Sequence, residues 1–340
     1  MAADSGIIRA ALLACLLLCW GALAASPENG EPGAKERLFD SDALLDITIA
    51  LHFKDLCRPR EDENCDFIPT TLEYTAAGGG KQELPVEVMV RGGWRSLSQN
   101  CSAPLLWVRF DADSARGTLF EGQSLLPLTT HCGQGLSLES MRNRRTRSDS
   151  EQDLLKEYLG QHMYTLFTGY SLRTRLLRIN YVDPDKPGRV VHNYAFFTEH
   201  FDSMAERNHA RRLERGQFDY RMLDLEAADR LALFQYMIGN TDWSIVRQRN
   251  TLLVLTAEGR QVPVPYDLDM SGLVNADYAG PAPGLPIDSV TQRHYLGFCH
   301  PGQDWQGLFD EFLARKMQIR ESIGDIPGLS ERSSLETQAF

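Results

Sequence analysis

The chain has 340 residues, of which 43% are hydrophobic and 24% charged, so it can build a sizeable core as one large domain or two lobes. Its formal net charge of −11 argues against a nucleic-acid-binding protein, because such proteins normally carry a basic face. Beyond the N-terminal segment, no run of residues approaches the ~20 apolar residues that span a bilayer.

The first 24 residues are typical of a cleavable secretory signal peptide. Arg9 precedes an apolar run from Ala10 to Trp20, and Ala22-Leu23-Ala24 offers a small-residue cleavage site. An uncleaved membrane anchor is the alternative. We therefore expect a secreted or periplasmic protein without a transmembrane span after cleavage, in which residues 25–43 form a loose leader.

Five cysteines follow the signal segment and favour disulfide bonds, which are typical of exported proteins. Cys57 and Cys65 flank a short polar loop and are expected to pair. Cys101 and Cys132 bracket two predicted strands and are candidates for a second bridge, which leaves Cys299 over. No C-x-x-C motif or histidine cluster accompanies these residues, which argues against a zinc site.

The sequence favours β-strands from Leu45 to about Thr130. Between Leu45 and Leu51 apolar and polar residues alternate, as in a half-buried strand. Gly78-Gly79-Gly80 predicts a hairpin turn. Strands are expected over residues 45–51, 70–74, 84–90, 105–110 and 125–129.

Helices and strands are mixed from residue 150 to Thr198, and helices dominate afterwards. Asp224 and Gly239 are cap residues at the two ends of the clearest helix. The expected elements are a helix from Ser148 or Ser150 to Gly169, strands over 172–181 and 190–197, a helix over 225–238, a hairpin of strands 252–255 and 262–265, and a helix over 305–323. These patterns predict a β-rich N-terminal lobe with one helix, residues 44–199, and a helical C-terminal lobe, residues 200–340.

One segment combines acidic and amide side chains in an order that suits phosphoryl transfer. Gly239-Asn240-Thr241-Asp242 follows a predicted helix, Asn250 closes the next loop, and Tyr266-Asp267-Leu268-Asp269 leaves the predicted hairpin. One carboxylate can orient the attacking hydroxyl group or accept its proton. An amide oxygen and a second carboxylate can hold a divalent metal against nucleotide phosphates.

This pattern resembles the catalytic and metal-binding segments of atypical kinases, especially the CotH spore-coat kinase-like family and, more distantly, HipA-type kinases. The Arg91-Gly92-Gly93 turn is similar to the Arg-Gly element of CotH-like proteins. The resemblance covers residues 45–325, with its strongest motifs between 239 and 270. It implies a two-lobed α+β protein-kinase-like fold with a β-rich N-terminal lobe and a mainly helical C-terminal lobe.

The resemblance also implies roles for individual residues. Asp242 would be the catalytic aspartate. Asn250 and Asp267 would be the metal ligands, with Asp269 as an auxiliary ligand. The implied activity is transfer of the terminal phosphoryl group of ATP, with magnesium or manganese, to a hydroxyl group on an extracytoplasmic protein or small molecule.

The nucleotide contacts implied by the resemblance depart from the family pattern. Glu157 would be the glutamate that orients a nucleotide-contacting lysine, and Glu199 lies in the hinge expected to meet the adenine. The strand around Pro127 offers no such lysine, and no G-x-G-x-x-G loop is present. Arg109 is the fallback cation, which keeps the positive charge but changes its geometry.

Two alternatives remain open. Without the lysine and the glycine-rich loop, the chain could be a pseudokinase that binds nucleotide without turnover. It could also be a cell-envelope structural or adhesion protein whose aspartates, with Asp277, bind calcium. Taken singly, Asp242 could cap a turn and Glu157 could lie on a solvated helix face.

Overall fold

The computed structural model describes residues 37–52, 55–57, 65–76, 79–98, 100–133 and 144–340. The predicted signal peptide, residues 1–24, and most of the predicted leader lie outside these residues. The described residues all belong to the unit Glu36–Phe340.

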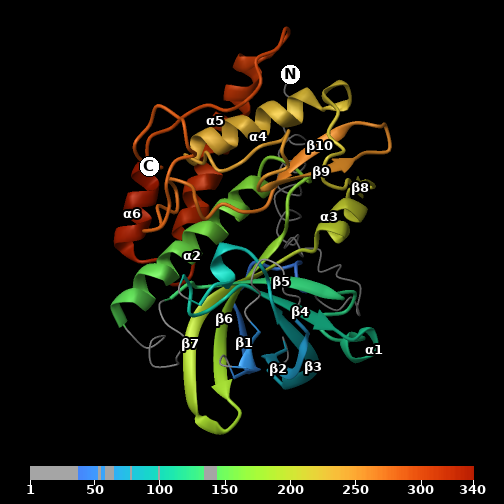
Figure 1. The fold of residues 1–340 in the computed structure, drawn as a ribbon, viewed down its shortest axis with the longest axis vertical. Coiled ribbons are helices and arrows are strands. Elements are labelled where there is room, and N and C mark those ends of the chain that lie inside the picture. The colour runs from blue at the N-terminus through green and yellow to red at the C-terminus, as the bar shows by residue number, and fades with distance from the viewer. Residues whose placement is uncertain (1–36, 53–54, 58–64, 77–78, 99, 134–143) are drawn as a thin grey trace, which may run out of the picture. The chain divides into compact units, whose positions relative to one another are not determined.

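Seven strands close into a β-barrel (Figure 1). In their order around the barrel they are β1 (Leu45–Ala50), β2 (Ile68–Thr75), β3 (Lys81–Val90), β4 (Leu106–Phe110), β5 (Leu125–Thr130), β7 (Lys186–Thr198) and β6 (Thr174–Asp183). Neighbouring strands are antiparallel except β1 and β6, which pair in parallel with Leu45 opposite Leu177. This parallel pair closes the sheet, so the barrel has no open edge.

The alternating residues of the strands form the barrel core. Ile47, Leu126 and Ile179 are among its fully buried side chains. Leu38, in the described part of the predicted leader, is buried in the same core. Arg175 fixes that segment, because its Nη1 donates a hydrogen bond to the Leu38 carbonyl at 3.2 Å.

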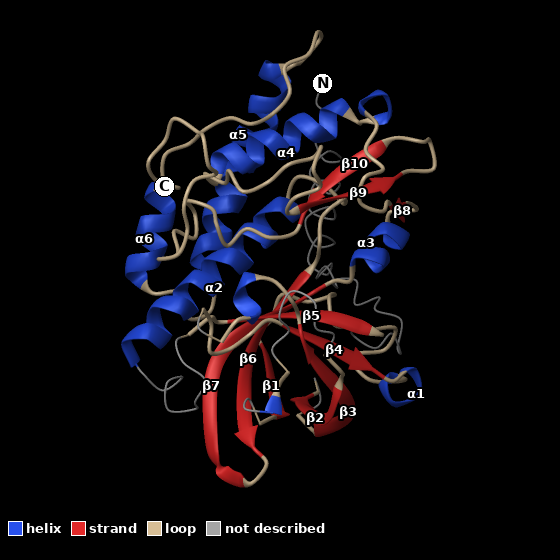
Figure 2. Ribbon diagram, in the orientation of Figure 1, coloured by secondary structure: helices blue, strands red, loops and turns tan. Residues whose placement is uncertain are grey.

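The remaining elements are six helices and a second sheet among the described residues (Figure 2). The helices are α1 (Ala112–Ala115), α2 (Arg144–Thr165), α3 (Phe201–Arg207), α4 (Leu225–Met237), α5 (Trp305–Gly324) and α6 (Glu331–Ala339), and the sheet is β10 (Gln261–Pro265), β9 (Thr251–Leu255) and β8 (Arg211–Arg212). In a second apolar core, Tyr158 of α2 packs on Phe196 of β7, and Tyr164 of α2 packs on Phe234 of α4. Helix α2 therefore connects the barrel to the helices that follow it.

Most locally encoded elements were predicted correctly. The predicted helix over 225–238 is α4, in which Asp224 accepts a hydrogen bond from the Ala227 N–H at 2.9 Å. Gly239 follows it with a φ of 64°, a conformation that favours glycine. The predicted hairpin is β9 and β10. Helix α2 already includes Arg144, so it begins before the predicted start at Ser148 or Ser150.

Both expected disulfide bonds are present. Cys57 pairs with Cys65 and Cys101 pairs with Cys132, while Cys299 is exposed and unpaired among the described residues. Disulfide bonds of this kind are typical of proteins in oxidising compartments. Within the part of the chain that the structure describes, no helix has the length and apolar character to cross a membrane.

The predicted two-lobed α+β protein-kinase-like fold is wrong. The N-terminal strands and β6 and β7 close into one seven-stranded barrel, and residues 200–340 contain a three-stranded sheet beside the helices instead of a mainly helical lobe. Closure depends on β1 and β6, in which Asp46 pairs with Arg178 across 132 positions of sequence. Alternation of apolar residues identifies a strand and its buried face, but it does not identify a partner so far along the chain.

Burial of Ile179 in the barrel core predicts how its substitution changes the free energy of unfolding. Replacing Ile179 with Ala should lower the free energy of unfolding by about 3 kcal/mol, because it removes buried methyl groups and leaves a cavity opposite Ile47. Urea unfolding at equilibrium measures this change. The control is Glu83→Ala on exposed β3 surface, which should change stability by less than about 0.5 kcal/mol. Equal effects of the two substitutions on the free energy of unfolding would contradict the burial of Ile179 in the barrel core.

Candidate functional site

The four residues assigned to catalysis and metal binding line one cavity of about 420 Å³. These residues are Asp242, Asn250, Asp267 and Asp269, and the same cavity is lined by Trp94, Arg95, Arg249 and Tyr278. A larger cavity of about 860 Å³ lies among α2, α4, α5 and α6, but none of the described residues that line it is acidic. A third cavity, of about 430 Å³, is lined by acidic residues and His300, but it contains none of the four residues assigned to catalysis and metal binding.

The loop after α4 presents Asp242 to the cavity. Its backbone N–H donates to the Asn240 side-chain oxygen at 2.9 Å, and backbone hydrogen bonds between Ser244 and Arg249 close the loop. Asn250 follows with a φ of 47°, which asparagine tolerates better than most residues. Its amide donates to the Asp242 carbonyl at 2.8 Å and to the Asp242 carboxylate at 2.9 Å. The loop geometry thus couples the predicted catalytic aspartate directly to a predicted metal ligand.

The carboxylate of Asp242 is more basic than an ordinary aspartate. Burial raises its pKa, and the negative charge of Asp269 raises it further. The ion pair with Arg249 and the hydrogen bond from Asn250 oppose this rise but do not cancel it. A raised pKa brings a carboxylate closer to the range in which it accepts protons at neutral pH.

Asp267 and Asp269 leave β10 as a crowded acidic pair. Burial raises the pKa of Asp267 well above its ordinary range, and the negative charges of Asp269 and Glu157 raise it further. The positive charges of Arg95 and Arg91 act in the opposite direction without cancelling this effect. Such crowding favours binding of a cation, which would relieve the repulsion among the carboxylates.

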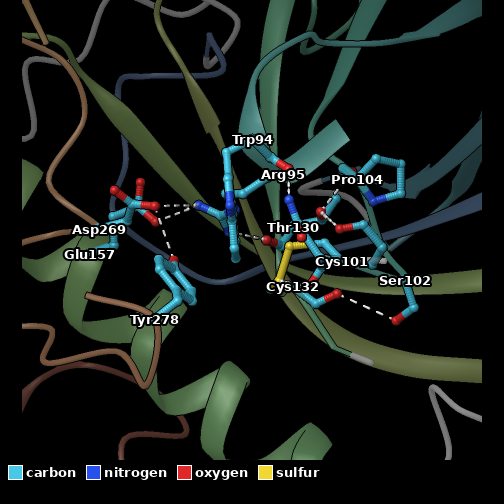
Figure 3. The surroundings of a disulfide bond; sticks show 12 residues. Trp94, Arg95, Cys101, Ser102, Pro104, Thr130, Cys132, Glu157, Asp269 and Tyr278 are labelled. Carbon is cyan, nitrogen blue, oxygen red and sulfur yellow. Dashed lines mark hydrogen bonds and ion pairs between the residues drawn. A yellow bond between two sulfur atoms is a disulfide. The ribbon is translucent and has the colours of Figure 1, made fainter. Parts of the chain in front are cut away.

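The principal protein cation at this site is Arg95, shown in Figure 3. Its Nη2 donates to the Thr130 carbonyl at 2.8 Å, and its Nη1 lies 3.2 Å from Glu157 Oε2. The same Nη1 lies 3.8 Å from Asp269 Oδ2, which accepts a hydrogen bond from Tyr278 at 3.0 Å. The Arg95 side chain is only 9% exposed, and its Nε has no hydrogen-bond partner among the described residues.

The electrostatic setting keeps this guanidinium charged. Burial acts to lower the pKa of Arg95, but Tyr278 and Glu157, followed by Asp269, outweigh it and hold the pKa above its ordinary value. Burial lowers the pKa of the neighbouring Arg91, whose guanidinium lies over the Trp107 ring.

Glu157 of α2 is buried against Arg95, so the alternative that it lies on a solvated helix face is wrong. Burial raises the pKa of Glu157, and the charge of Arg95 opposes that rise. The resemblance predicted a glutamate that orients a nucleotide-contacting lysine. In the structure its cationic partner is an arginine.

The other two predicted cofactor contacts do not reach the cavity. Arg109 is exposed on β4, where its Nε donates to Glu87 at 2.6 Å and its guanidinium lies 3.9 Å from the centre of the Phe67 ring. Glu199 is buried, but it pairs with Arg207 at 2.9 Å and does not line the cavity. Arg109, the fallback cation, therefore lies outside the cavity, whereas Arg95 lines it.

Sequence reasoning missed Arg95 because it looked for the cation on a strand. Arg95 lies instead in the 3-10 turn Trp94–Ser96, directly after the Arg91-Gly92-Gly93 turn that the resemblance had already marked. Gly93 has a φ of 110°, a conformation that favours glycine, and it redirects the chain from β3 into that turn. A search for basic residues within a few positions of the glycines would have found Arg95.

A second group of potential metal ligands was not identified from the sequence. His52, Asp183 and Asp185 offer ligand atoms that all lie within 4.8 Å of one another, although the Asp185 side chain is 71% exposed. The aspartates of the 420 Å³ cavity do not form so tight a set. A magnesium ion there would take one or two carboxylates and complete its shell with water and phosphate oxygens, as magnesium commonly does.

Comparisons with known proteins found no match: no family model, no curated protein and no solved structure matches this chain. The resemblance to CotH-like atypical kinases rests on the residues quoted for it, chiefly Asp242, Asn250 and Asp267.

The raised pKa of Asp267 predicts a stability gain on its neutralisation. Because the folded state binds this proton more tightly than the unfolded state, the wild-type protein loses stability as the pH rises above 3.8 through the folded-state pKa. The asparagine side chain of Asp267→Asn does not ionise, so this variant avoids the cost of burying a charged carboxylate. It should therefore unfold at higher urea concentration than wild type at pH 7, with a smaller difference at pH 4.

The matched control is Asp113→Asn on exposed α1, which should leave the urea midpoint close to that of the wild type at pH 7. If Asp267→Asn has a lower urea midpoint than the wild type at pH 7 without added metal, the ionised Asp267 stabilises the folded protein, and the prediction is wrong.

Proposed function

We propose that this protein is an extracytoplasmic, metal-dependent phosphotransferase that moves the terminal phosphoryl group of ATP to a hydroxyl group on a protein or small molecule. The observation that carries the proposal is the shared cavity of Asp242, Asn250, Asp267 and Asp269 beside the buried guanidinium of Arg95. Function resides in a site and not in a fold, so the departure from a protein-kinase-like fold leaves this argument intact.

In this proposal Asp267 and Asn250 would hold magnesium or manganese, with Asp269 as the auxiliary ligand. Carboxylate and amide oxygens are suitable ligands for these cations. The metal would supply positive charge against the nucleotide phosphates. The raised pKa of Asp267 is compatible with this assignment, because burial and the charges of Asp269 and Glu157 disfavour the ionised carboxylate, and a bound cation would favour it.

Asp242 would orient the acceptor hydroxyl group and accept its proton. Its raised pKa suits that role. One of its oxygens is paired with Arg249, whose side chain is 55% exposed and faces the same cavity. Because this guanidinium is so exposed, Arg249 could leave Asp242 and pair with a phosphate oxygen when nucleotide binds. The Asp242 carboxylate would then be available to the acceptor hydroxyl group.

Arg95 would take the place of the family's phosphate-contacting lysine. A guanidinium remains charged at all physiological pH values and can bind phosphate through two donors. Arg95 already uses its two Nη atoms on Thr130 and Glu157, and its Nε remains as a buried donor among the described residues. Catalysis of phosphoryl transfer consists mainly of such positioning and charge stabilisation.

Nucleotide binding without transfer is the second candidate function. It is favoured by the contacts of Asp242, because one carboxylate oxygen is paired with Arg249 and the other accepts from Asn250. If these contacts persist when nucleotide is bound, the aspartate cannot accept a proton. The protein would then be a nucleotide-binding module with the same metal ligands.

We propose that the protein is secreted or periplasmic. It rests on the signal peptide predicted over residues 1–24 together with the two disulfide bonds.

The first test separates transfer from binding. Asp242→Asn should lower manganese-dependent phosphate transfer from labelled ATP by about 10²–10⁴-fold, the usual contribution of a general base, while leaving nucleotide affinity within about twofold. Asp267→Ala should instead abolish metal-dependent nucleotide binding. Transfer is measured by autoradiography of the protein and of generic acceptors, and binding by calorimetry.

Arg109→Ala is the matched control, since it removes a cation that lies outside the cavity. It should change neither transfer nor binding. Nucleotide affinity that survives Asp267→Ala would remove the assigned metal site. Binding without transfer by the wild type would favour the non-catalytic candidate, and a response to calcium but not to ATP would favour the calcium-binding alternative.

A further inference from the structure

We infer that the Cys101–Cys132 disulfide bond holds Arg95 in the candidate site, so that the site binds phosphate groups more tightly when the two cysteines are oxidised to the disulfide. The inference rests on the proposed function of the cavity and adds a mode of regulation to it.

The disulfide connects the two chain segments whose contact positions Arg95. Cys101 lies in the loop after the 3-10 turn that carries Arg95, and Cys132 lies two residues after Thr130 at the end of β5. The carbonyl of Thr130 accepts the hydrogen bond from Arg95 Nη2 at 2.8 Å. Figure 3 shows the disulfide beside this contact and the acidic side chains on the other side of the guanidinium.

Other contacts also hold the described residues of this loop to the end of β5, including one from the Ser102 hydroxyl group to the Cys132 carbonyl. The Ala103 N–H donates to the Cys132 carbonyl at 3.0 Å, and the Thr130 hydroxyl group lies 3.0 Å from the Ala103 carbonyl and 2.8 Å from that of Pro104. The described residues between the 3-10 turn and β4 have no regular secondary structure, although Cys101, Ser102 and Ala103 are buried. The cross-link restricts this loop in addition to these contacts.

Displacement of Arg95 would have a large effect on anion binding. Its side chain is 9% exposed and its guanidinium contacts Glu157 and Asp269, so it is the buried cation beside these two carboxylates. If the loop moves away, those carboxylates remain and repel phosphate oxygens. Phosphate affinity should therefore depend on the position of this one side chain.

The second disulfide provides an internal comparison. Cys57 and Cys65 are eight positions apart in the connection between β1 and β2, and neither residue lines the cavity. Its removal eliminates a cross-link without releasing the loop of Arg95.

The redox step balances by thiol–disulfide exchange. The thiols of Cys101 and Cys132 lose two protons and two electrons as their bond forms, and a small-molecule or protein disulfide accepts them and becomes two thiols. This exchange is favoured in the oxidising compartments that exported proteins reach, while reducing compartments favour the two thiols. The site would therefore become competent after export.

A double-mutant cycle on the full chain tests the inference. The variants are Cys101→Ser with Cys132→Ser, Arg95→Gln, and the combination of all three substitutions, with Cys57→Ser plus Cys65→Ser as the control. Affinity for manganese–ATP is measured by calorimetry. Loss of the first disulfide should weaken binding by about tenfold or more, as expected for one charge-assisted hydrogen bond, whereas the control should stay within about twofold.

The cycle separates a positioning role from a general structural one. If the disulfide acts through Arg95, removing it from Arg95→Gln should cause no further loss of affinity. Additive losses, or unchanged affinity in the disulfide variant, would overturn the inference. If the serine variant fails to fold by circular dichroism, Cys101→Ala with Cys132→Val fills the space with apolar side chains and is measured in its place.

A second readout does not depend on nucleotide. Phenylglyoxal labelling of Arg95, located by peptide mass spectrometry, should be about tenfold faster in the disulfide variant than in the oxidised wild type, because the side chain is buried only while the loop is held. Equal labelling rates would overturn the inference even if nucleotide binds. Wild-type protein that protects Arg95 but binds no manganese–ATP would instead refute the proposed function and leave the positioning role standing.

Discussion

Several carboxylates can share one partly buried cavity only if cations offset their repulsion, and Arg95 is the buried cation that contacts them. It joins the barrel, through Thr130 of β5, to Glu157 of α2 and to Asp269 beyond β10. Elements far apart in the chain thus meet through one guanidinium. Burial raises the pKa of Asp267 well above its ordinary range, the charges of Asp269 and Glu157 raise it further, and a divalent metal would stabilise the ionised carboxylate.

Local features were predictable because their signals lie within a few residues. Asp224 and Gly239 mark the two ends of α4, and alternation of apolar and polar residues marks β1. The order of Asp242, Asn250 and Asp267 also predicted residues that share one cavity. Barrel closure and Arg95 escaped prediction, because the first depends on pairing across more than a hundred residues and the second on a tertiary contact made by an irregular turn.

The site favours ligand binding at the expense of stability. Burial of Asp267 and Glu157 raises the pKa of each, so their charged forms are costly in the folded protein. Two disulfide bonds offset part of such a cost by restricting the unfolded chain, and one of them lies beside Arg95. Carboxyl groups with raised pKa values that gather at one cavity are the pattern expected of a functional site.

Anomalous diffraction at the manganese edge would locate a metal ion in the cavity of Asp242, Asn250, Asp267 and Asp269. The crystals would contain the full chain with manganese and a non-hydrolysable ATP analogue. We expect an anomalous peak in the 420 Å³ cavity from a manganese ion bound to a carboxylate oxygen of Asp267, with nucleotide phosphate between the metal and Arg95. Manganese bound only by His52, Asp183 and Asp185, with no peak in that cavity, would contradict it.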